Sequence, residues 1–441
     1  MRRAIFTSHY RCLYPTASSD FFRLAVGVGL LFCSLISGLL TNVVNAAEIN
    51  VAPGAGTLQA AINTASNGDV LQLQAGKYKG SVIIDRAIAL VGIADSVVDA
   101  GGDGRVIMVA APDVIIRGLT IRGSGDRLDI EDSGIFVAPE GDRALIEGNQ
   151  LEGNLIGVYL KGPNDAVVRD NVIVGSRNPH MNDRGNGIHL WNTPGSVIEG
   201  NTLQFGRDGI FVMTSKRNIF RNNHFSDMRY AIHYMYTHDS EVTDNVSLRN
   251  NSAYAVMYSD RLKVSGNRST GDRERGLFLN ATNKSDFQGN IISGGPEKCV
   301  FIYNANMNTF TDNYFAGCDI GIYFTGSADD TFSGNTFSGN RTQVKYVGTR
   351  HIELSVNGRG NYWSDNPAFD LNNDGIADSP YRPNDMVDQL LWKHPLSKLL
   401  INTPAMQLLR WSQSEFPTLF PGGVVDSAPL MHAPVAIQSE S

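Results

Sequence analysis

Histidine and methionine side chains recur at matching points of a repeating pattern between residues 189 and 257. Five positions predicted to point outward from short β-strands on four neighbouring repeats are held by His189, Met213, His233, Met235 and Met257. Neighbouring strands of a sheet lie about 4.8 Å apart and residues i and i+2 about 6.6 Å apart, so we expect these side chains on one face. Thioethers and imidazoles, without thiolate or carboxylate, suit Cu(I) better than Zn²⁺, Ca²⁺ or Mg²⁺. The pattern therefore predicts a Cu(I) site.

An expansion of the repeat, SRNPHMNDRGN at 176–186, comes just before the strand that carries His189. It brings His180 and Met181 to the same edge, and loops that interrupt a strict repeat often carry function. We predict that His189 or the His180–Met181 pair supplies an exchangeable ligand of the copper site. The alternative is that the outward side chains stack as a ladder, or contact a protein partner, with Met filling gaps.

A second group of ligand-type residues follows the last repeat, within NYWSDNPAFDLNNDGIADSPY. Positions 1, 3, 5, 7 and 9 of an EF-hand-like loop are filled by Asp370, Asn372, Asp374, Ile376 (through its carbonyl) and Asp378. Position 12 is Tyr381 instead of the bidentate Glu, and no flanking helix pair is evident. The spacing favours Ca²⁺ or a similar hard cation, with a polar Asx-turn cap as the alternative. In either case the loop is expected to seal the end of the fold.

The elements that must position these side chains are short strands of a repeating unit, G-Φ-x-Φ, a turn and Φ-x-x-N, where Φ is apolar. The recurring asparagines are Asn149, Asn171, Asn201, Asn223, Asn245, Asn267, Asn290, Asn313, Asn335 and Asn357. A period near 22 residues with strand patterning and little helix predicts an all-β, right-handed parallel β-helix. The asparagines are expected to stack as an amide ladder at one turn, which makes them scaffold.

The alignment of repeats also predicts which side chains face inward. It pairs Ile232 with Val256 and Tyr234 with Tyr258 in the core, which places Met257 beside His233. A helix at 57–65 with Thr57 as its N-cap is expected to close the N-terminal end. The predicted organisation is a signal peptide at 1–46, the parallel β-helix at 47–360, an acidic capping loop at 361–384 and an apolar, partly helical partner-docking tail at 385–441.

The first 46 residues have the features of an export signal. Four arginines flank or precede the apolar run at 24–40, and Val44-Asn45-Ala46 fits signal-peptidase cleavage near Ala46. The net charge is −7 at pH 7, and loss of the leader makes the protein more acidic. Nucleic acid is therefore excluded as a partner, because phosphate binding needs a basic face. We expect a periplasmic protein, in which Cys299 and Cys318, about one repeat apart, have a spacing that permits a disulfide without proving one.

The C-terminal tail contains short apolar stretches that Pro395 and Pro404 interrupt. Its apolar residues are Leu390, Leu391, Leu396, Leu399, Leu400, Met406, Leu408, Leu409 and Trp411. These stretches are too short to span a bilayer. They predict docking on a membrane-protein partner, with folding back on the coil as the alternative.

Several of these segments together resemble the NosD family over nearly the whole exported chain. The most specific are NYWSD…DLNNDGIADSPY and LLRWSQSEFP…GGVVDSAPLM, at the end of a 22-residue-repeat β-helix. The resemblance implies a periplasmic accessory protein for the maturation of nitrous-oxide reductase. It also implies an ATP-driven (ABC-type) membrane transporter as a partner and a lipoprotein copper chaperone as the donor of copper.

The rival interpretation is a β-helix polysaccharide lyase, hydrolase or epimerase. Such enzymes need paired carboxylates or a calcium-assisted base, and no outward Asp pair recurs on neighbouring repeats. The charged candidates are Asp183, Arg184, Arg207, Asp208, Arg273 and Arg275. A carbohydrate-binding module or adhesin without metal is a third interpretation. We predict an accessory factor and not an enzyme.

Overall fold

The structure is a computed structural model that describes residues 46–434, except residues 328, 348–351, 385 and 417–422. The chain divides into two units, Met1–Asn45 and Ala46–Ser441. All described residues belong to the second unit. The predicted signal peptide, apart from Ala46, lies outside the described residues.

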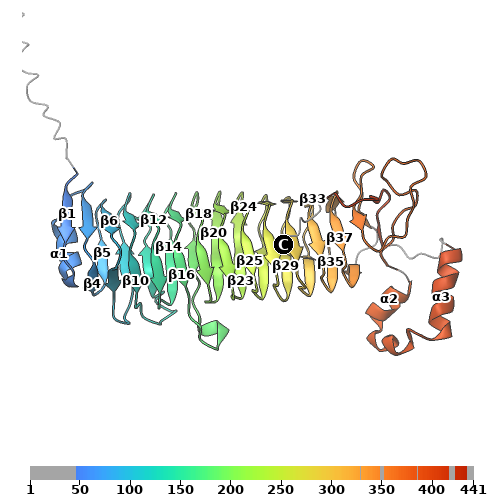
Figure 1. The fold of residues 1–441 in the computed structure, drawn as a ribbon, viewed down its shortest axis with the longest axis horizontal. Coiled ribbons are helices and arrows are strands. Elements are labelled where there is room, and N and C mark those ends of the chain that lie inside the picture. Colours follow the sequence, from blue (N-terminus) through green and yellow to red (C-terminus); the bar gives the residue numbers. More distant parts are fainter. Residues whose placement is uncertain (1–45, 328, 348–351, 385, 417–422, 435–441) are drawn as a thin grey trace, which may run out of the picture. The chain divides into compact units, whose positions relative to one another are not determined.

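Short parallel strands stack coil upon coil and form three long sheets, here called A, B and C (Figure 1). Sheet A has the strands β1 (Glu48–Val51), β3 (Val70–Leu73), β6 (Ala89–Gly92), β9 (Ile115–Arg117), β12 (Leu145–Glu147), β15 (Val167–Arg169), β18 (Val197–Glu199), β21 (Ile219–Arg221), β24 (Glu241–Thr243), β27 (Lys263–Ser265), β30 (Asp286–Gln288), β33 (Thr309–Thr311) and β36 (Thr331–Ser333). Sheet B has β2 (Gly54–Ala55), β4 (Gly76–Lys79), β7 (Ser96–Asp99), β10 (Thr120–Arg122), β13 (Gln150–Glu152), β16 (Val172–Val174), β19 (Thr202–Gln204), β22 (His224–Ser226), β25 (Val246–Leu248), β28 (Arg268–Thr270), β31 (Ile291–Ser293), β34 (Tyr314–Ala316), β37 (Thr336–Ser338) and β40 (Tyr362–Trp363). Sheet C has β5 (Val82–Ile84), β8 (Ile107–Val109), β11 (Ser133–Val137), β14 (Ile156–Lys161), β17 (Ile188–Trp191), β20 (Asp208–Lys216), β23 (Tyr230–His238), β26 (Ser252–Met257), β29 (Arg275–Asn280), β32 (Lys298–Tyr303), β35 (Ile320–Thr325) and β38 (Thr342–Val347). The predicted all-β parallel β-helix is confirmed.

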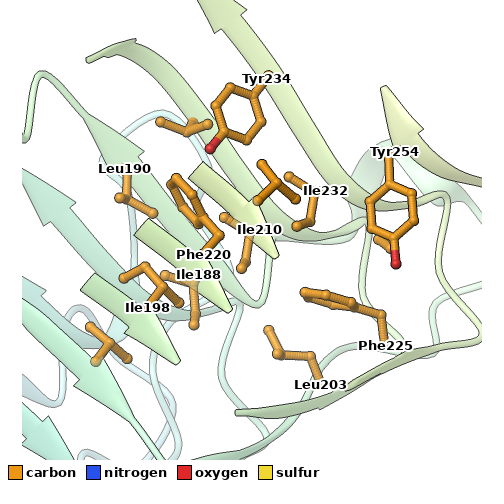
Figure 2. Close-up of a cluster of buried hydrophobic side chains, with 14 of the residues drawn as sticks. Ile188, Leu190, Ile198, Leu203, Ile210, Phe220, Phe225, Ile232, Tyr234 and Tyr254 are labelled. Atoms are coloured by element: carbon orange, nitrogen blue, oxygen red, sulfur yellow. The ribbon is translucent and has the colours of Figure 1, made fainter. Parts of the chain in front are cut away.

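The core lies inside the coil, where side chains from all three sheets meet (Figure 2). Ile188, Ile210 and Ile232 follow one another on consecutive strands of sheet C and are at most 1% exposed. The glycine of the G-Φ-x-Φ unit lets adjacent coils approach. A Cβ at Gly209 would lie 2.5 Å from the carbonyl oxygen of Ala231 on the next coil. The repeat thus combines a buried apolar column with a tight backbone contact.

The predicted asparagine ladder is present, with one correction. The Nδ2 of each asparagine from Asn149 to Asn335 donates to the Oδ1 of the next at 2.8–3.0 Å. The last member is Asn361 and not Asn357, which lies in a turn with φ 51°. The prediction was wrong there because the final coil, at 26 residues, is longer than the coils of 22 and 23 residues just before it, so counting the usual period stops short.

The predicted inward alignment is wrong at β26. Tyr254 pairs with Ile232 and Val256 with Tyr234, so both Tyr254 and Val256 are buried. Met257 therefore lies beside Met235, and Ala255 lies beside His233. The true period between these coils is 22 residues, and the bulky Tyr254 fills an inward position where the prediction assumed an aliphatic residue. Its hydroxyl donates to the carbonyl oxygens of Asn245 (2.8 Å) and Arg268 (2.9 Å), which satisfies the buried group.

A helix and an irregular segment close the two ends of the β-helix. Helix α1 (Thr57–Thr64) buries Leu58 and Ile62, and its N-cap is Gly56 rather than the predicted Thr57. At the other end β41 (Val424–Val425) pairs with β39 (Ile352–Glu353). The Oδ2 of Asp426 accepts hydrogen bonds from the Asn361 backbone (2.8 Å) and from the Trp363 indole (2.9 Å). The segment after the tail helices therefore terminates the asparagine ladder.

The tail between β40 and β41 contains three helices: α2 (Met386–Lys393), the 3₁₀ helix η2 (Pro395–Leu400) and α3 (Pro404–Glu415). The Trp392 ring packs edge-on against Tyr346 of β38, with centroids 5.5 Å apart. Leu396 and Leu399 are 84% and 86% exposed. Across the described residues, the helices are too short or too polar to cross a bilayer.

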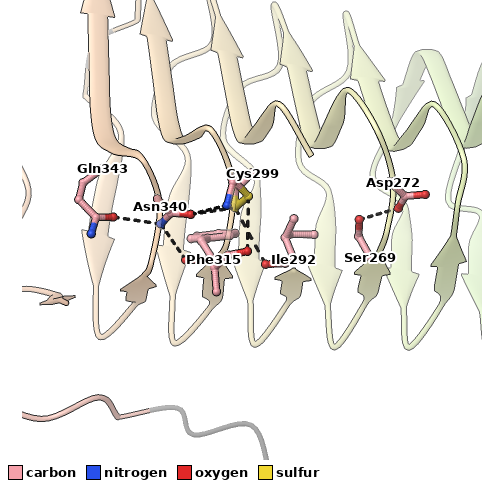
Figure 3. Close-up of a disulfide and its surroundings, with 9 residues drawn as sticks. Ser269, Asp272, Ile292, Cys299, Phe315, Asn340 and Gln343 are labelled. Carbon is pink, nitrogen blue, oxygen red and sulfur yellow. Dashed lines mark hydrogen bonds between the residues drawn. A yellow bond between two sulfur atoms is a disulfide. The ribbon is translucent and has the colours of Figure 1, made fainter. Parts of the chain in front are cut away.

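Cys299 and Cys318 form a disulfide with Cα atoms 5.7 Å apart (Figure 3). The sequence left this bond open, because spacing alone does not define it. Both cysteines are buried. The side chain of Asn340, one coil further on, accepts a hydrogen bond from the Cys318 backbone at 2.9 Å. The disulfide therefore joins two neighbouring coils inside the C-terminal half of the β-helix.

Candidate metal-binding face and adjoining pocket

Three methionines form a continuous column on the outer face of sheet C. Met213 pairs in register with Met235, and Met235 with Met257, on three consecutive strands. All three side chains are half-buried. Trp191 precedes the column and Asn280 follows it. The column, called here the methionine ladder (Met213, Met235 and Met257), brings three thioethers together at the spacing of adjacent strands, about 4.8 Å.

His233 lies two residues before Met235 on the same outward face and is 8% exposed. Its Nδ1 is 3.1 Å from the Oδ2 of Asp208. The Nε2 is buried and has no hydrogen-bond partner among the described residues. Because Ala255 occupies the next coil beside His233, no large side chain of β26 lies directly against the ring. The imidazole therefore has one nitrogen oriented by a carboxylate and the other free.

The carboxylate of Asp208 is held on both sides. Arg229 donates its Nε to Oδ1 at 2.8 Å and a second nitrogen to Oδ2. Burial pushes the pKa of Asp208 upward, but the hydrogen bonds from His233 and Arg229 outweigh this effect and lower the pKa below its ordinary value. Asp208 is thus an anion at neutral pH. An anionic carboxylate on Nδ1 of a histidine fixes the orientation of the ring, as it does behind many metal-ligating histidines.

His189 is separated from His233 by one coil. The Phe211 ring lies between them, with ring centroids 4.9 Å from His189 and 5.0 Å from His233. On its other side His189 stacks on Tyr159 at 4.3 Å. Burial lowers the pKa of His189 to about 4, so the ring is neutral at neutral pH. The two imidazoles are therefore too far apart to share one metal ion.

A pocket of about 190 Å³ opens beside His189, lined by Leu128, Glu131, Ile156, Arg184, Gly185, Asn186, His189, Arg207, Asp208 and Phe211. It lies where the strands of sheet C begin, whereas the methionine ladder lies further along the same strands. His180 and Met181 belong to the loop before this pocket; His180 is exposed and Met181 half-buried. The structure thus brings Met213, His233, Met235 and Met257 to one area, places His189 at the same strand position as His233 with one coil between them, and leaves His180 and Met181 in the loop before the pocket.

The acidic loop folds around its own backbone. Asp370 accepts hydrogen bonds from the backbone N–H groups of Asn373 (2.7 Å) and Gly375 (2.8 Å). Asp374 accepts from Ile376, and Asp378 accepts from Leu371, both at 2.8 Å. Asn372 donates to Asp374 at 3.0 Å. The predicted ligands do lie in one loop, and in this structure their oxygens serve as Asx-turn acceptors.

Within the described part of the chain, no group of three or more His, Cys, Asp or Glu side chains is arranged to hold a metal ion. Thioethers are therefore the donors that distinguish the face of sheet C. Sequence reasoning did not assign Asp208 and Arg229 to the histidine. In the sequence, Asp208 is a carboxylate that lies one coil and three residues before His233. The strand register is needed to show that the two side chains are in contact.

Comparison with known proteins is consistent with this geometry. The profile of the family described as "Periplasmic copper-binding protein (NosD)" matches residues 176–368, which include the whole methionine ladder. A protein of Stutzerimonas stutzeri, "Probable ABC transporter binding protein NosD", is 41% identical over 378 residues, 82% of this chain and 87% of its own. The chain belongs to the NosD family. The protein of the same name from Pseudomonas aeruginosa is 42% identical over 378 residues, 82% of this chain and 88% of its own. The NosD family is thus described as periplasmic and copper-binding.

Solved structures share the fold at low sequence identity. A family 28 exopolygalacturonase of Yersinia enterocolitica superposes with a TM-score of 0.54 and 11% identity, over 69% of this chain and 79% of that enzyme. At this identity the likeness establishes the parallel β-helix and nothing about the reaction. For members of the NosD family, as for any other β-helix, only the side chains indicate whether the protein is an enzyme.

Proposed function

We propose that the protein is a periplasmic accessory factor that binds Cu(I) through Met213, Met235, Met257 and the Nε2 of His233. It would receive copper from a lipoprotein chaperone and support the assembly of the copper sites of nitrous-oxide reductase, together with an ABC-type membrane transporter. Copper here is cargo and not a resident cofactor. Export through cleavage near Ala46 is part of the proposal.

The observation that carries the proposal is the buried, unpaired Nε2 of His233, two residues before Met235 on the strand that carries the middle of the methionine ladder. Cu(I) prefers thioether and imidazole ligands, and thioethers bind it weakly enough to let it leave. The buried Nε2 has no other partner among the described residues, and an unpaired buried polar atom costs about 1–3 kcal/mol. A metal ion would remove that cost. The Asp208 carboxylate on Nδ1 supports the ring in the orientation that a metal needs.

The ligand set is narrower than the one that the sequence suggests. His189 lies beyond the Phe211 ring, and His180 and Met181 lie in the loop at the strand-entry side. We therefore leave these three residues out of the copper site. The place of His180 and Met181 in the loop before the strand fits an entry route better than a coordinating role.

The apolar helices of the tail support a protein partner. Leu396, Leu399 and Leu408 are strongly exposed on η2 and α3, and exposed apolar clusters of this kind mark contact surfaces. Two relatives carry the words "ABC transporter binding protein" in their names. We propose that η2 and α3 contact the transporter. An accessory role also fits sheet C better than a hydrolase or lyase does, since its buried carboxylate Asp208 is already paired with Arg229 and His233.

The test is an anaerobic competition titration of the purified exported protein against a chromogenic Cu(I) chelator. Replacing both Met235 and Met257 by Leu should weaken Cu(I) binding by at least tenfold, because two thioether ligands are lost at constant side-chain volume. The matched control is Met307→Leu, an exposed methionine outside the ladder. Equal affinities of the parent and the double variant would refute this ligand set, and the absence of Cu(I) binding by the parent would refute the function.

A further inference from the structure

The pocket beside His189 contains several polar atoms that the protein itself does not satisfy. The Oδ1 of Asn186, the Nδ1 of His189 and the Nε of Arg207 are buried, and each lacks a hydrogen-bond partner within the described residues. Buried polar atoms in folded proteins are almost always paired, so these three atoms around one cavity are available to a polar ligand. None of these atoms belongs to the proposed copper group.

The charges around the pocket favour an anion. Its two carboxylates are already neutralised: Glu131 is bound by Lys161 at 2.6 Å and by Arg105 at 3.5 Å, and Asp208 is bound by Arg229. Among the described residues, Arg184 donates to the backbone carbonyls of Asn178 and Gly206.

Neither Arg184 nor Arg207 forms an ion pair with a described carboxylate. The surplus charge of the pocket is therefore positive. Guanidinium groups without an ionic partner are suited to carboxylates, which they hold in a planar, two-bond arrangement.

The remaining unpaired atoms require a second kind of group on the ligand. The Oδ1 of Asn186 accepts hydrogen bonds, and the Nδ1 of a neutral His189 donates or accepts according to its tautomer. A carboxylate offers no donor, whereas a hydroxyl group does. Ile156 and Phe211 supply apolar walls for a short carbon skeleton. The volume of about 190 Å³ is below the roughly 300 Å³ at which pockets for drug-sized ligands begin.

We infer that this pocket binds a small hydroxycarboxylate. Its carboxylate lies between Arg184 and Arg207, and its hydroxyl donates its one hydrogen to the Oδ1 of Asn186 and accepts from the Nδ1–H of His189. This site is distinct from the methionine ladder, and it does not depend on the proposed copper function. It gives the outer face of sheet C two binding sites on neighbouring coils, one at the start of the strands and one further along them.

Isothermal titration calorimetry of the metal-free protein tests the inference. The probes are L-lactate and D-galacturonate, compared with acetate, which has no hydroxyl, D-galactose, which has no carboxylate, and sulfate. At least one hydroxycarboxylate is expected to bind tenfold or more tightly than all three comparison compounds. Arg207→Gln should weaken that binding at least tenfold, and His189→Phe, which keeps the ring stacked on Tyr159, should weaken it several-fold.

Two controls separate this site from folding and from copper. Arg221→Gln removes an exposed arginine of β21 in sheet A that pairs with Glu199 of β18, and should leave binding unchanged. Replacement of Met235 and Met257 by Leu should also leave it unchanged. The inference is overturned if neither hydroxycarboxylate binds, if acetate or sulfate binds equally well, or if a folded Arg207→Gln protein binds as the parent does. Folding is checked by the thermal midpoint.

Discussion

Asp208 and His233 lie on consecutive coils, yet the Oδ2 of Asp208 is 3.1 Å from the Nδ1 of His233. The contact exists because Asp208 begins β20, whereas His233 is the fourth residue of β23 and its ring turns back toward the start of the strands. Tyr230 covers the ring from the same strand, with centroids 4.9 Å apart. The result is a buried carboxylate–imidazole pair on the outside of the coil.

Asp208→Asn should reduce stability. The change leaves Arg229, whose side chain is 23% exposed, without its ionic partner, and breaking a buried ion pair costs about 3–5 kcal/mol. Urea denaturation followed by circular dichroism should show a lower free energy of unfolding for Asp208→Asn. The double variant Asp208→Asn with Arg229→Met should recover part of the loss. A single variant as stable as the parent would show that Arg229 is solvated instead.

Asp330 should make the β-helix less stable in alkaline solution. Burial raises the pKa of Asp330 from 3.8 to about 7, although hydrogen bonds from Asn308 act in the opposite direction. The folded state therefore favours the protonated acid. Its contribution to stability is complete below about pH 4 and is lost as the pH rises through 7.

Asp330→Asn keeps the Oδ1 that Asn308 uses at 2.8 and 3.0 Å and removes the charge. At pH 8 the variant should be more stable than the parent by about 1–3 kcal/mol, and at pH 4 the two should be nearly equal. Thermal midpoints of both proteins across this range give the comparison. A difference that does not change with pH would contradict the prediction.

Removal of the disulfide should destabilise the C-terminal coils. Cys299 and Cys318 enclose a segment of 19 residues, and a loop of this size corresponds to about 3 kcal/mol of chain entropy in the unfolded state. Cys299→Ala with Cys318→Ala should lower the free energy of unfolding by that order. The cysteines are buried, so chemical reduction of the folded parent is expected to be slow. A double variant with unchanged stability would contradict this entropic account.

A calcium titration distinguishes the two interpretations of the acidic loop, a Ca²⁺ site and an Asx-turn cap. If it binds Ca²⁺, millimolar Ca²⁺ should raise the thermal midpoint of the parent, because a ligand of the folded state stabilises it. The rise should disappear in Asp370→Asn with Asp374→Asn. A midpoint that does not respond to Ca²⁺ leaves the Asx-turn cap seen in the structure as the role of these residues.

The periodic part of the fold is predictable from sequence, because each coil repeats the same apolar columns and the same asparagine. The errors at Met257 and Asn357 both arise where the period is hard to recognise in the sequence. At Met257 a bulky inward tyrosine hides it, and at Asn357 a longer final coil does. Strand alternation places Met213 beside Met235 correctly, whereas Met257 joins the methionine ladder only once the strand register is known. The Asp208–His233 contact and the pocket beside His189 depend on contacts between coils and on an irregular loop, which sequence spacing does not define.

The carboxylate of Asp426 at the end of the asparagine ladder also changes how the tail helices are connected. The segment that carries these helices is fixed to the β-helix on both sides. Asn384 is hydrogen-bonded to Val344 before the helices, and Asp426 is hydrogen-bonded to Asn361 after them. A transporter that bound η2 and α3 would hold a segment that is attached to the β-helix at both of its ends. A force on this segment would act on the last coils at two points. Motion of the transporter would therefore rotate the β-helix and would not simply extend a flexible linker.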